Sequence, residues 1–306
     1  MNTRILAVDY EYLAPATLKE ALSVLGEKEG VKILAGGTDL ITMLKTGSDA
    51  NMKYMLDVKR VPGLDYIRYD DGEKTLHIGP TATLSQIEKN DLVKEKYEAL
   101  SEAISLMASV SVRNMATMAG NICNASPVAD SVVPAICYGA VLTLASSRAE
   151  RTIPLHEFFT GPLGLNARAA DEMLTDIALP LPKPNTGAAF FKKARVKSDI
   201  AKLSVGALIE REGQNSQKIA VCRIAMGAAG STSDYLKEVG DSMAGKKMTE
   251  QLIAETVALA MAHIKPSSAR RFPRSRWSTP EYKLHIAEVM TADAVREAWK
   301  RAGGEL

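Results

Sequence analysis

Two short segments that contain glycine carry residue types suited to holding a nucleotide. The first, AGGTD at residues 35–39, follows the apolar run at residues 31–34, and the second, TMAGN at residues 117–121, follows an amphipathic stretch. Glycine has no Cβ, so it admits positive φ angles and leaves amide N–H groups open to an anion such as a diphosphate. Together, the two segments predict that a long dinucleotide is held from two sides.

No set of catalytic acids, bases, nucleophiles or metal ligands can be recognised in the sequence. Its three cysteines, Cys123, Cys137 and Cys222, share no CxxC spacing, so we expect buried free thiols. The four histidines are scattered, and no Ser-His-Asp or Cys-His arrangement can be recognised. This pattern fits a protein whose chemistry resides in a bound cofactor.

Length and charge limit the class of protein. The 306 residues can bury a substantial core and predict two domains rather than one. A formal net charge of +2 with mixed signs gives no nucleic-acid signature. No apolar run approaches the roughly 20 residues of a membrane span, and residues 1–10 lack the charged-then-apolar order of a signal peptide. We therefore expect a cytoplasmic protein that binds neither nucleic acid nor membrane.

The pattern of apolar and polar residues predicts the elements that must position the two segments. Thr17 and Glu20 form a capping box at the start of a helix over residues 17–27. A hairpin over residues 67–78 is expected to turn at an Asp-Gly pair. Further helices are expected over residues 95–109 and 127–138, and strands over residues 31–34, 55–58, 141–145, 151–155 and 174–179.

Prolines at alternate positions of residues 180–184 predict a stiff connector between two domains. Beyond it, three strand-like stretches precede three helical ones, which predicts a small antiparallel sheet with helices packed on it. The strands are expected over residues 188–196, 203–211 and 218–226, and the helices over residues 233–243, 249–264 and 280–302. The basic, aromatic stretch at residues 270–277 is interpreted as an exposed loop or a partner-binding surface.

These motifs resemble those of a known family, the FAD-binding medium subunits of molybdenum hydroxylases, which include carbon monoxide dehydrogenase and xanthine dehydrogenase. The resemblance begins at YLAP (residues 12–15), and its specific parts are residues 35–39, residues 117–121 and ASPVAD at residues 125–130. It implies an α+β fold: a two-subdomain FAD-binding domain of the vanillyl-alcohol oxidase (PCMH) type, then a small C-terminal α+β domain with a three-stranded antiparallel sheet. The implied domains span residues 1–179, with subdomains of about 1–58 and 59–179, and residues 185–304.

The resemblance also implies which residues hold the cofactor. Thr117 would contact a phosphate or the ribityl chain, Asn121 the flavin side, and Asp130 a ribityl or adenosine hydroxyl group. Lys192 would lie near the flavin and favour its anionic reduced form. The full set implied for the FAD site comprises Leu34, Ala35, Gly36, Gly37, Thr38, Asp39, Leu40, Thr117, Ala119, Gly120, Asn121, Cys123, Ser126, Asp130, Leu174 and Lys192.

Several of these residues also have a simpler interpretation, and residues 35–39 by themselves would equally be an ordinary strand-to-helix turn. Asp39 stands where the family often has serine, and because two anions repel, its carboxylate is expected to cap a helix or meet the ribityl chain. Cys123 and Leu174 would equally fit plain core packing. For Lys192, the simpler interpretation is a solvated lysine that protects a strand edge. Ala119 replaces a glycine common in the family, which predicts a slightly different loop.

The resemblance implies a function in electron transfer. A large subunit would hold the molybdopterin and oxidise the substrate, a small subunit would carry two 2Fe-2S clusters, and non-covalent FAD on this chain would pass electrons to NAD⁺ or another acceptor. The implied assembly is a dimer of such heterotrimers, with molybdenum or tungsten. Two alternatives stay open: a stand-alone FAD-dependent oxidoreductase of the same fold, and a non-catalytic nucleotide-binding assembly module.

Overall fold

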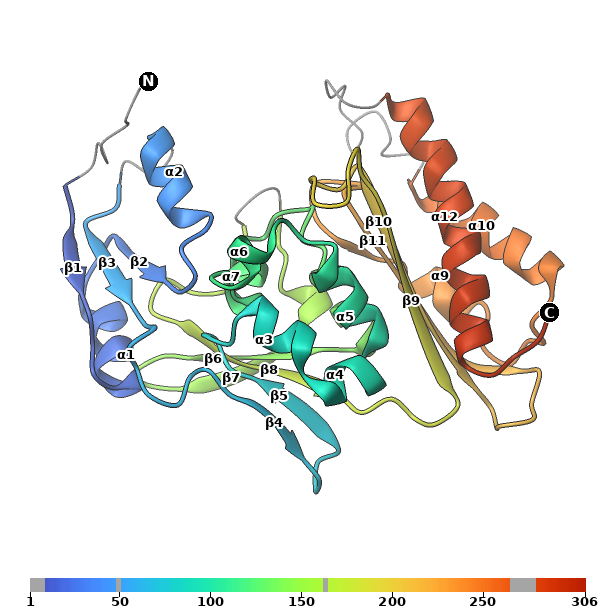
Figure 1. Ribbon diagram of the computed structural model, residues 1–306, viewed down its shortest axis with the longest axis horizontal. Helices are drawn as coiled ribbons and strands as arrows, with labels where there is room; N and C mark the ends of the chain where they lie inside the picture. Colours follow the sequence, from blue (N-terminus) through green and yellow to red (C-terminus); the bar gives the residue numbers. More distant parts are fainter. Residues whose placement is uncertain (1–8, 48–50, 162–164, 265–278) are drawn as a thin grey trace.

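The computed structural model describes residues 9–47, 51–161, 165–264 and 279–306, which form three β-sheets and the helices around them (Figure 1). The N-terminal sheet is parallel, and the other two sheets are antiparallel. This mixture of sheets and helices confirms the expected α+β class. The basic stretch at residues 270–277 lies outside the described residues.

The N-terminal sheet and its helix follow the sequence pattern closely. In spatial order, the strands are β1 (Glu11–Leu13), β3 (Tyr54–Asp57) and β2 (Val31–Leu34). Helix α1 (Leu18–Glu27) begins where expected, because the Thr17 hydroxyl accepts a hydrogen bond from the Glu20 amide at 3.2 Å. The reciprocal half of the expected capping box is shifted by one residue, since the Glu20 carboxylate accepts from the amide of Ala16 at 2.8 Å.

A five-stranded antiparallel sheet forms the middle of the molecule. In spatial order, its strands are β4 (Ile67–Asp70), β5 (Thr75–Ile78), β8 (Met173–Pro180), β6 (Val141–Ala145) and β7 (Glu150–Pro154). The expected hairpin over residues 67–78 is confirmed by the pairing of β4 with β5. Alternate residues such as Leu76, Leu142 and Ile177 are buried against helices on one face. Those helices are α3 (Leu84–Lys89), α4 (Asp91–Lys96), α5 (Glu98–Ser105) and α8 (Val132–Tyr138).

Two expected helices are shorter in the structure than the sequence pattern predicts. The helix expected over residues 95–109 is broken at Tyr97, whose φ of −126° and ψ of 47° are not helical, and a positive φ at Ala108 separates α5 from the short α6 (Val110–Arg113). The helix expected over residues 127–138 begins only at Val132. The carbonyl of Pro127 is instead engaged by an amide of the C-terminal part, which keeps this stretch out of the helix.

The C-terminal sheet has four strands, so the expectation of three was wrong. The strands are β12 (Asp234–Tyr235), β11 (Ile219–Gly227), β10 (Leu203–Arg211) and β9 (Thr186–Lys193), in spatial order. The two residues of β12 are too few to show an alternating pattern, and they lie where the sequence predicts the start of a helix. The three helices are α9 (Lys237–Asp241), α10 (Glu250–Ile264) and α12 (Pro280–Arg301).

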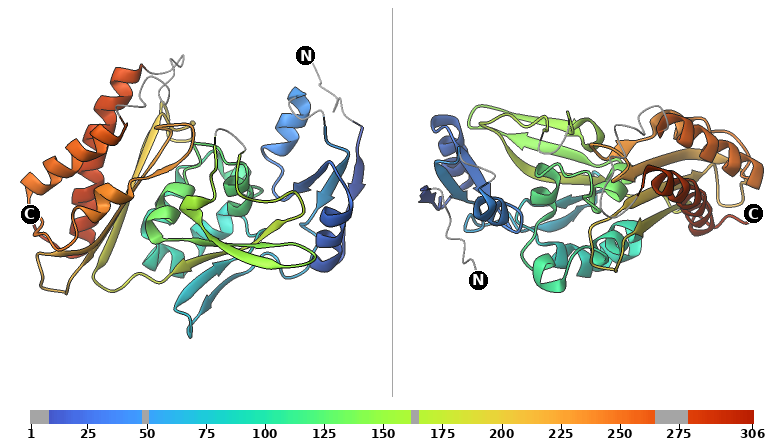
Figure 2. Two further views of the ribbon diagram at one scale, coloured as in Figure 1. Left: turned by 180° about the vertical axis from the view of Figure 1, so that it is seen from behind. Right: turned by 90° about the horizontal axis from the view of Figure 1, so that it is seen from above.

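The C-terminal sheet is sandwiched between helices. Its outer face packs on α10 and α12, and its inner face packs on α5 and α8 (Figures 1 and 2). Gly206 on β10 permits the close approach of α8, because a Cβ there would lie 2.9 Å from a methyl group of Val133 and 3.2 Å from the sulfur of Cys137. Within the described residues, no helix is both long and apolar enough to cross a bilayer.

Arg301, near the end of α12, joins the C-terminal part to α5. Its guanidinium donates to both carboxylate oxygens of Glu102, at 3.0 and 2.8 Å, and to the carbonyl of Ala188 at 3.0 Å. Because these charge-assisted bonds join side chains that are only partly exposed, Arg301→Ala is expected to lower the free energy of unfolding by about 1.5–3 kcal/mol in urea denaturation. The matched control is Arg296→Ala, which breaks the exposed pair with Glu250 and is expected to cost at most about 1 kcal/mol. If Arg301→Ala and Arg296→Ala lost the same free energy of unfolding, the contacts of Arg301 would contribute no more to stability than an exposed ion pair, contrary to the prediction.

Candidate functional site

One cavity of about 600 Å³ brings the two glycine segments together. Its lining also includes residues of β8, β9 and the turn that follows β9, so the N-terminal, middle and C-terminal parts of the chain all contribute. All the predicted site residues line it except Leu34, which is buried in a small apolar cluster with Leu44 and Met55. The structure therefore gathers these residues at one place, and their contacts with a ligand stay a prediction.

Gly36 is required by a close contact between the two segments. A Cβ at this position would lie 2.3 Å from the carbonyl oxygen of Met115 and 2.7 Å from the Cα of Ala116. These are backbone atoms that no rotamer change can move. The next residue, Gly37, has a φ of 72°, a conformation that L-residues rarely adopt. The first segment is thus held directly against the chain that leads into the second, and this contact closes one wall of the cavity.

Asp39 does not cap a helix, contrary to one of its two expected roles. Helix α2 (Leu40–Thr46) begins after it, but the backbone of Asp39 is already helical and its carboxylate makes no capping bond. The carboxylate instead accepts a hydrogen bond from the side-chain amide of Asn124 at 3.1 Å. Asp39 thereby ties the first segment to the residue after α7 (Met118–Cys123). Burial raises the pKa of Asp39, since a neutral amide offsets its charge only in part.

The second segment is the first turn of a helix rather than a loop. Thr117 occupies the N-cap of α7, and its hydroxyl accepts a hydrogen bond from the amide of Gly120 at 3.0 Å. Gly120 and Ala119 are both helical, so Ala119 needs no conformation that its methyl group forbids. Asn121, one turn on, accepts a hydrogen bond from the Ser131 hydroxyl at 2.8 Å. The helix thus fixes the side chains that face the cavity.

Asp130 and Lys192 form a buried ion pair at the cavity. The Lys192 ammonium lies 2.7 Å from Oδ2 of Asp130 and donates to the carbonyl of Leu106 at 2.8 Å, and the two side chains are 3% and 5% exposed. The interpretation of Lys192 as a solvated lysine on a strand edge was therefore wrong. The other carboxylate oxygen of Asp130, Oδ1, is buried and has no hydrogen-bond partner among the described residues. A buried acceptor left in this state needs a donor, which a ligand hydroxyl group would supply.

Burial raises the pKa of Asp130 to about 6, although the charge of Lys192 opposes the shift. A carboxyl group whose pKa is higher in the folded than in the unfolded chain binds its proton more tightly when folded. Its contribution to stability is complete below the unfolded value of about 3.9 and is lost as the pH rises through about 6. We expect urea denaturation of the flavin-free chain to show this decline, and Asp130→Asn to remove it. If the free energy of unfolding of Asp130→Asn depended on pH as it does in the wild type, the raised pKa of Asp130 would be contradicted.

Cys123 and Leu174 line the cavity and also belong to the core. Leu174 is 3% exposed within the largest apolar cluster, and Cys123 packs against the same cluster. Cys123 is a free thiol that is half-buried rather than buried, and desolvation raises its pKa to about 11, which favours the protonated form at neutral pH. Cys137 and Cys222 are buried free thiols, as expected.

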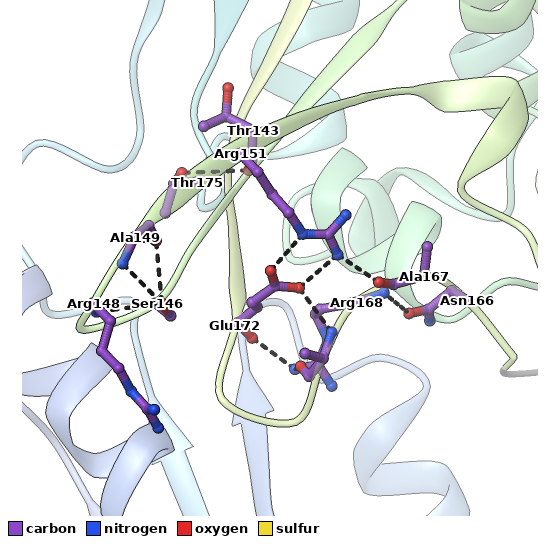
Figure 3. Close-up of polar contacts among 11 residues, drawn as sticks. Thr143, Ser146, Arg148, Ala149, Arg151, Asn166, Ala167, Arg168, Glu172 and Thr175 are labelled. Carbon is purple, nitrogen blue, oxygen red and sulfur yellow. Dashed lines mark hydrogen bonds and ion pairs between the residues drawn. The ribbon is translucent and has the colours of Figure 1, made fainter.

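Asn166 and Arg168 are among the cavity residues that the sequence analysis missed. The side-chain amide of Asn166 donates to the carbonyl of Cys123 at 2.9 Å. Its oxygen accepts from the amide of Arg168 at 3.1 Å (Figure 3). Both residues lie in the irregular connection that leads into β8, where no periodicity or glycine motif marks them. In the described parts of the chain, no cluster of three or more His, Cys, Asp or Glu side chains could hold a metal ion.

The cavity is thus lined by parts of the chain that are distant in sequence and that belong to all three sheets and their helices. Residues 8–182 match the family model described as the FAD binding domain in molybdopterin dehydrogenase. Residues 188–298 match the model described as the CO dehydrogenase flavoprotein C-terminal domain. The chain therefore belongs to the family of FAD-binding flavoprotein subunits of molybdopterin dehydrogenases, and it is an oxidoreductase subunit with FAD as its cofactor.

Relatives of known function agree with this assignment. The chain is 32% identical to the xanthine dehydrogenase FAD-binding subunit of Escherichia coli O157:H7, an alignment that covers 96% of this chain and 98% of the relative. It is 29% identical to the carbon monoxide dehydrogenase medium chain of Hydrogenophaga pseudoflava, over 95% and 98% of the two chains. A solved structure of carbon monoxide dehydrogenase from that organism superposes with a TM-score of 0.87 at 26% identity, covering 95% of this chain and 98% of the other.

Proposed function

We propose that this chain is the electron-transfer subunit of a molybdenum or tungsten hydroxylase, and that it holds non-covalent FAD in the cavity between its parts. The observation that carries the proposal is the buried Oδ1 of Asp130, an acceptor with no hydrogen-bond partner in the described parts of the chain, at a cavity walled by both glycine segments. Bound FAD supplies the redox chemistry, taking electrons singly and releasing them in pairs. The extents of the two family models support a division into domains at residues 1–179 and 185–304.

Different residues of the cavity contact different parts of the cofactor. Residues 35–38 and Thr117 present small groups and backbone to the diphosphate and ribityl chain, where a bulky side chain would block approach. Asp130 accepts from a hydroxyl group of the cofactor. Lys192 stabilises the ionised form of Asp130, so that this acceptor is available at neutral pH. The ammonium also places positive charge at the cavity wall, which would favour an anionic reduced flavin.

The partners follow from the kind of subunit that the relatives are. Their names describe FAD-binding subunits and medium chains, which supports a complex with a small 2Fe-2S subunit and a large molybdopterin subunit. We propose a dimer of such heterotrimers, in which electrons pass from the iron–sulfur clusters to this chain and then to NAD⁺ or another acceptor. The primary substrate would be bound by the large subunit.

The proposal is tested first on the chain and then on the complex. The purified chain should show the visible absorption of oxidised flavin, and denaturation should release intact FAD, identified by chromatography. In the complex, anaerobic addition of the large subunit's substrate should bleach this absorption only when the iron–sulfur subunit is present. A colourless chain that takes up no added FAD would refute the FAD site. Flavin that stays oxidised in the reduced complex would refute the electron-transfer role.

A further inference from the structure

The two ends of the cavity differ in chemistry. One end is formed with the C-terminal part, where Lys192 and Asp130 pair. The opposite end is formed by Ile33 on β2 and Met173 on β8, which pack in one apolar cluster, and by Arg168 beside them in the lining. FAD also has two chemically different ends, so different residues are needed at each end of the cavity to bind them.

The segment that carries Arg168 is held by a bidentate ion pair in which the carboxylate is buried and the guanidinium is exposed (Figure 3). Arg151 on β7 donates to both carboxylate oxygens of Glu172, at 2.6 and 2.8 Å, and its Nη2 also donates to the carbonyl of Ala167. The Glu172 carboxylate in turn accepts from the amide of Ala169 at 2.8 Å. Its side chain is 11% exposed. The connection around Arg168 is therefore fixed from both sides, as a side chain needs in order to meet a ligand at a defined place.

Arg168 keeps its charge available to the cavity. Its Nη1 donates to the backbone carbonyls of Ala169 and Glu172, at 3.0 and 2.7 Å. The Glu172 carboxylate is already engaged by Arg151, so one carboxylate faces two guanidinium groups and one positive charge is left over. Among the described residues, Arg168 forms no ion pair of its own, and of these three side chains only Arg168 lines the cavity. Arg168 thus brings an unpaired positive charge, among the described residues, to this part of the lining.

We propose that Arg168 recognises the adenosine monophosphate half of FAD, and that Arg151 and Glu172 are positioning residues for it. A guanidinium can pair with a phosphate or stack on a purine, and this half carries both groups. In the proposed function, the flavin half of FAD lies at the end of the cavity that contains Lys192. FMN lacks the adenosine monophosphate half, so Arg168 makes the chain selective for the dinucleotide. The inference rests on the proposed FAD site, and it adds Arg168 as the residue that binds the adenosine monophosphate half of the cofactor.

The test compares two flavins on the flavin-free chain. Arg168→Met should raise the Kd for FAD about 10- to 100-fold in a fluorescence titration, the loss expected for a charge-assisted contact. The Kd for FMN should change by less than about 2-fold, which is within the effect of a neutral surface substitution. Arg168→Lys keeps the charge without the planar fork and should fall between the wild type and Arg168→Met. Arg148→Met is the matched control, because that side chain is 79% exposed, and it should leave both values unchanged.

The positioning role has its own readout. Glu172→Gln should lower the ratio of FMN to FAD dissociation constants toward that of Arg168→Met, whereas a merely structural loss would weaken both flavins equally. An unchanged FAD affinity in Arg168→Met, or equal losses for FAD and FMN, would overturn the inference. A wild-type chain that binds neither flavin would overturn the proposed function instead, so the two failures are distinguishable.

Discussion

Gly36→Ala is expected to weaken FAD binding at least about 100-fold, the largest loss of affinity we expect from a single methyl group. The new Cβ would lie 2.3 Å from the carbonyl oxygen of Met115 and 2.7 Å from the Cα of Ala116. Both of these are backbone atoms, so no change of side-chain rotamer can relieve the clash. The only relief is to move the first segment away from the chain before α7, which opens the cavity wall. The measurement is the flavin content of the purified variant and its Kd for added FAD. Full flavin content would refute the proposed position of the site.

Two other glycines serve as controls for Gly36. A Cβ at Gly120 would meet only the Thr117 hydroxyl, at 3.0 Å, so Gly120→Ala should cost less affinity than Gly36→Ala although both positions line the cavity. Gly213, in the turn after β10, has open space where a Cβ would be, and Gly213→Ala should leave flavin content unchanged. Far-UV circular dichroism of each variant separates loss of the site from loss of the fold.

Local features of the fold were predictable because local residues determine them. The N-cap at Thr17, the hairpin over residues 67–78 and the strand at residues 203–211 depend on neighbours in sequence, and they lie where the pattern placed them. The fourth strand of the C-terminal sheet was missed because β12 exists only through its pairing with β11. Its residues carry no alternation of their own.

The candidate site shows the same division between local and long-range causes. The sequence indicated that Gly36 matters, but the contact that requires glycine comes from Met115, far along the chain. It could not indicate Arg168, whose place depends on an ion pair between Arg151 on β7 and Glu172, the residue before β8. Nor could it decide the role of Lys192, since β9 is an edge strand and an edge lysine is usually solvated. Packing against Leu106 and Asp130 settles its burial.

Lys192→Met is expected to lower the free energy of unfolding of the flavin-free chain by about 3–5 kcal/mol, because it leaves the buried Asp130 carboxylate without its cation. The neighbouring Lys193 is exposed, and Lys193→Met should stay within about 0.5 kcal/mol of the wild type. The measurement is urea denaturation of the single variants.

The double variant Asp130→Asn/Lys192→Met separates the ion pair from simple packing. Once the carboxylate is replaced by a neutral amide, the missing ammonium no longer leaves a buried charge, so the double variant should be more stable than Lys192→Met alone. Its FAD affinity should still fall, because the amide is a weaker acceptor for a cofactor hydroxyl group than the ionised carboxylate. Additive losses of stability would mean that Asp130 and Lys192 are not coupled, and they would remove the reason for Lys192 to keep this acceptor ionised.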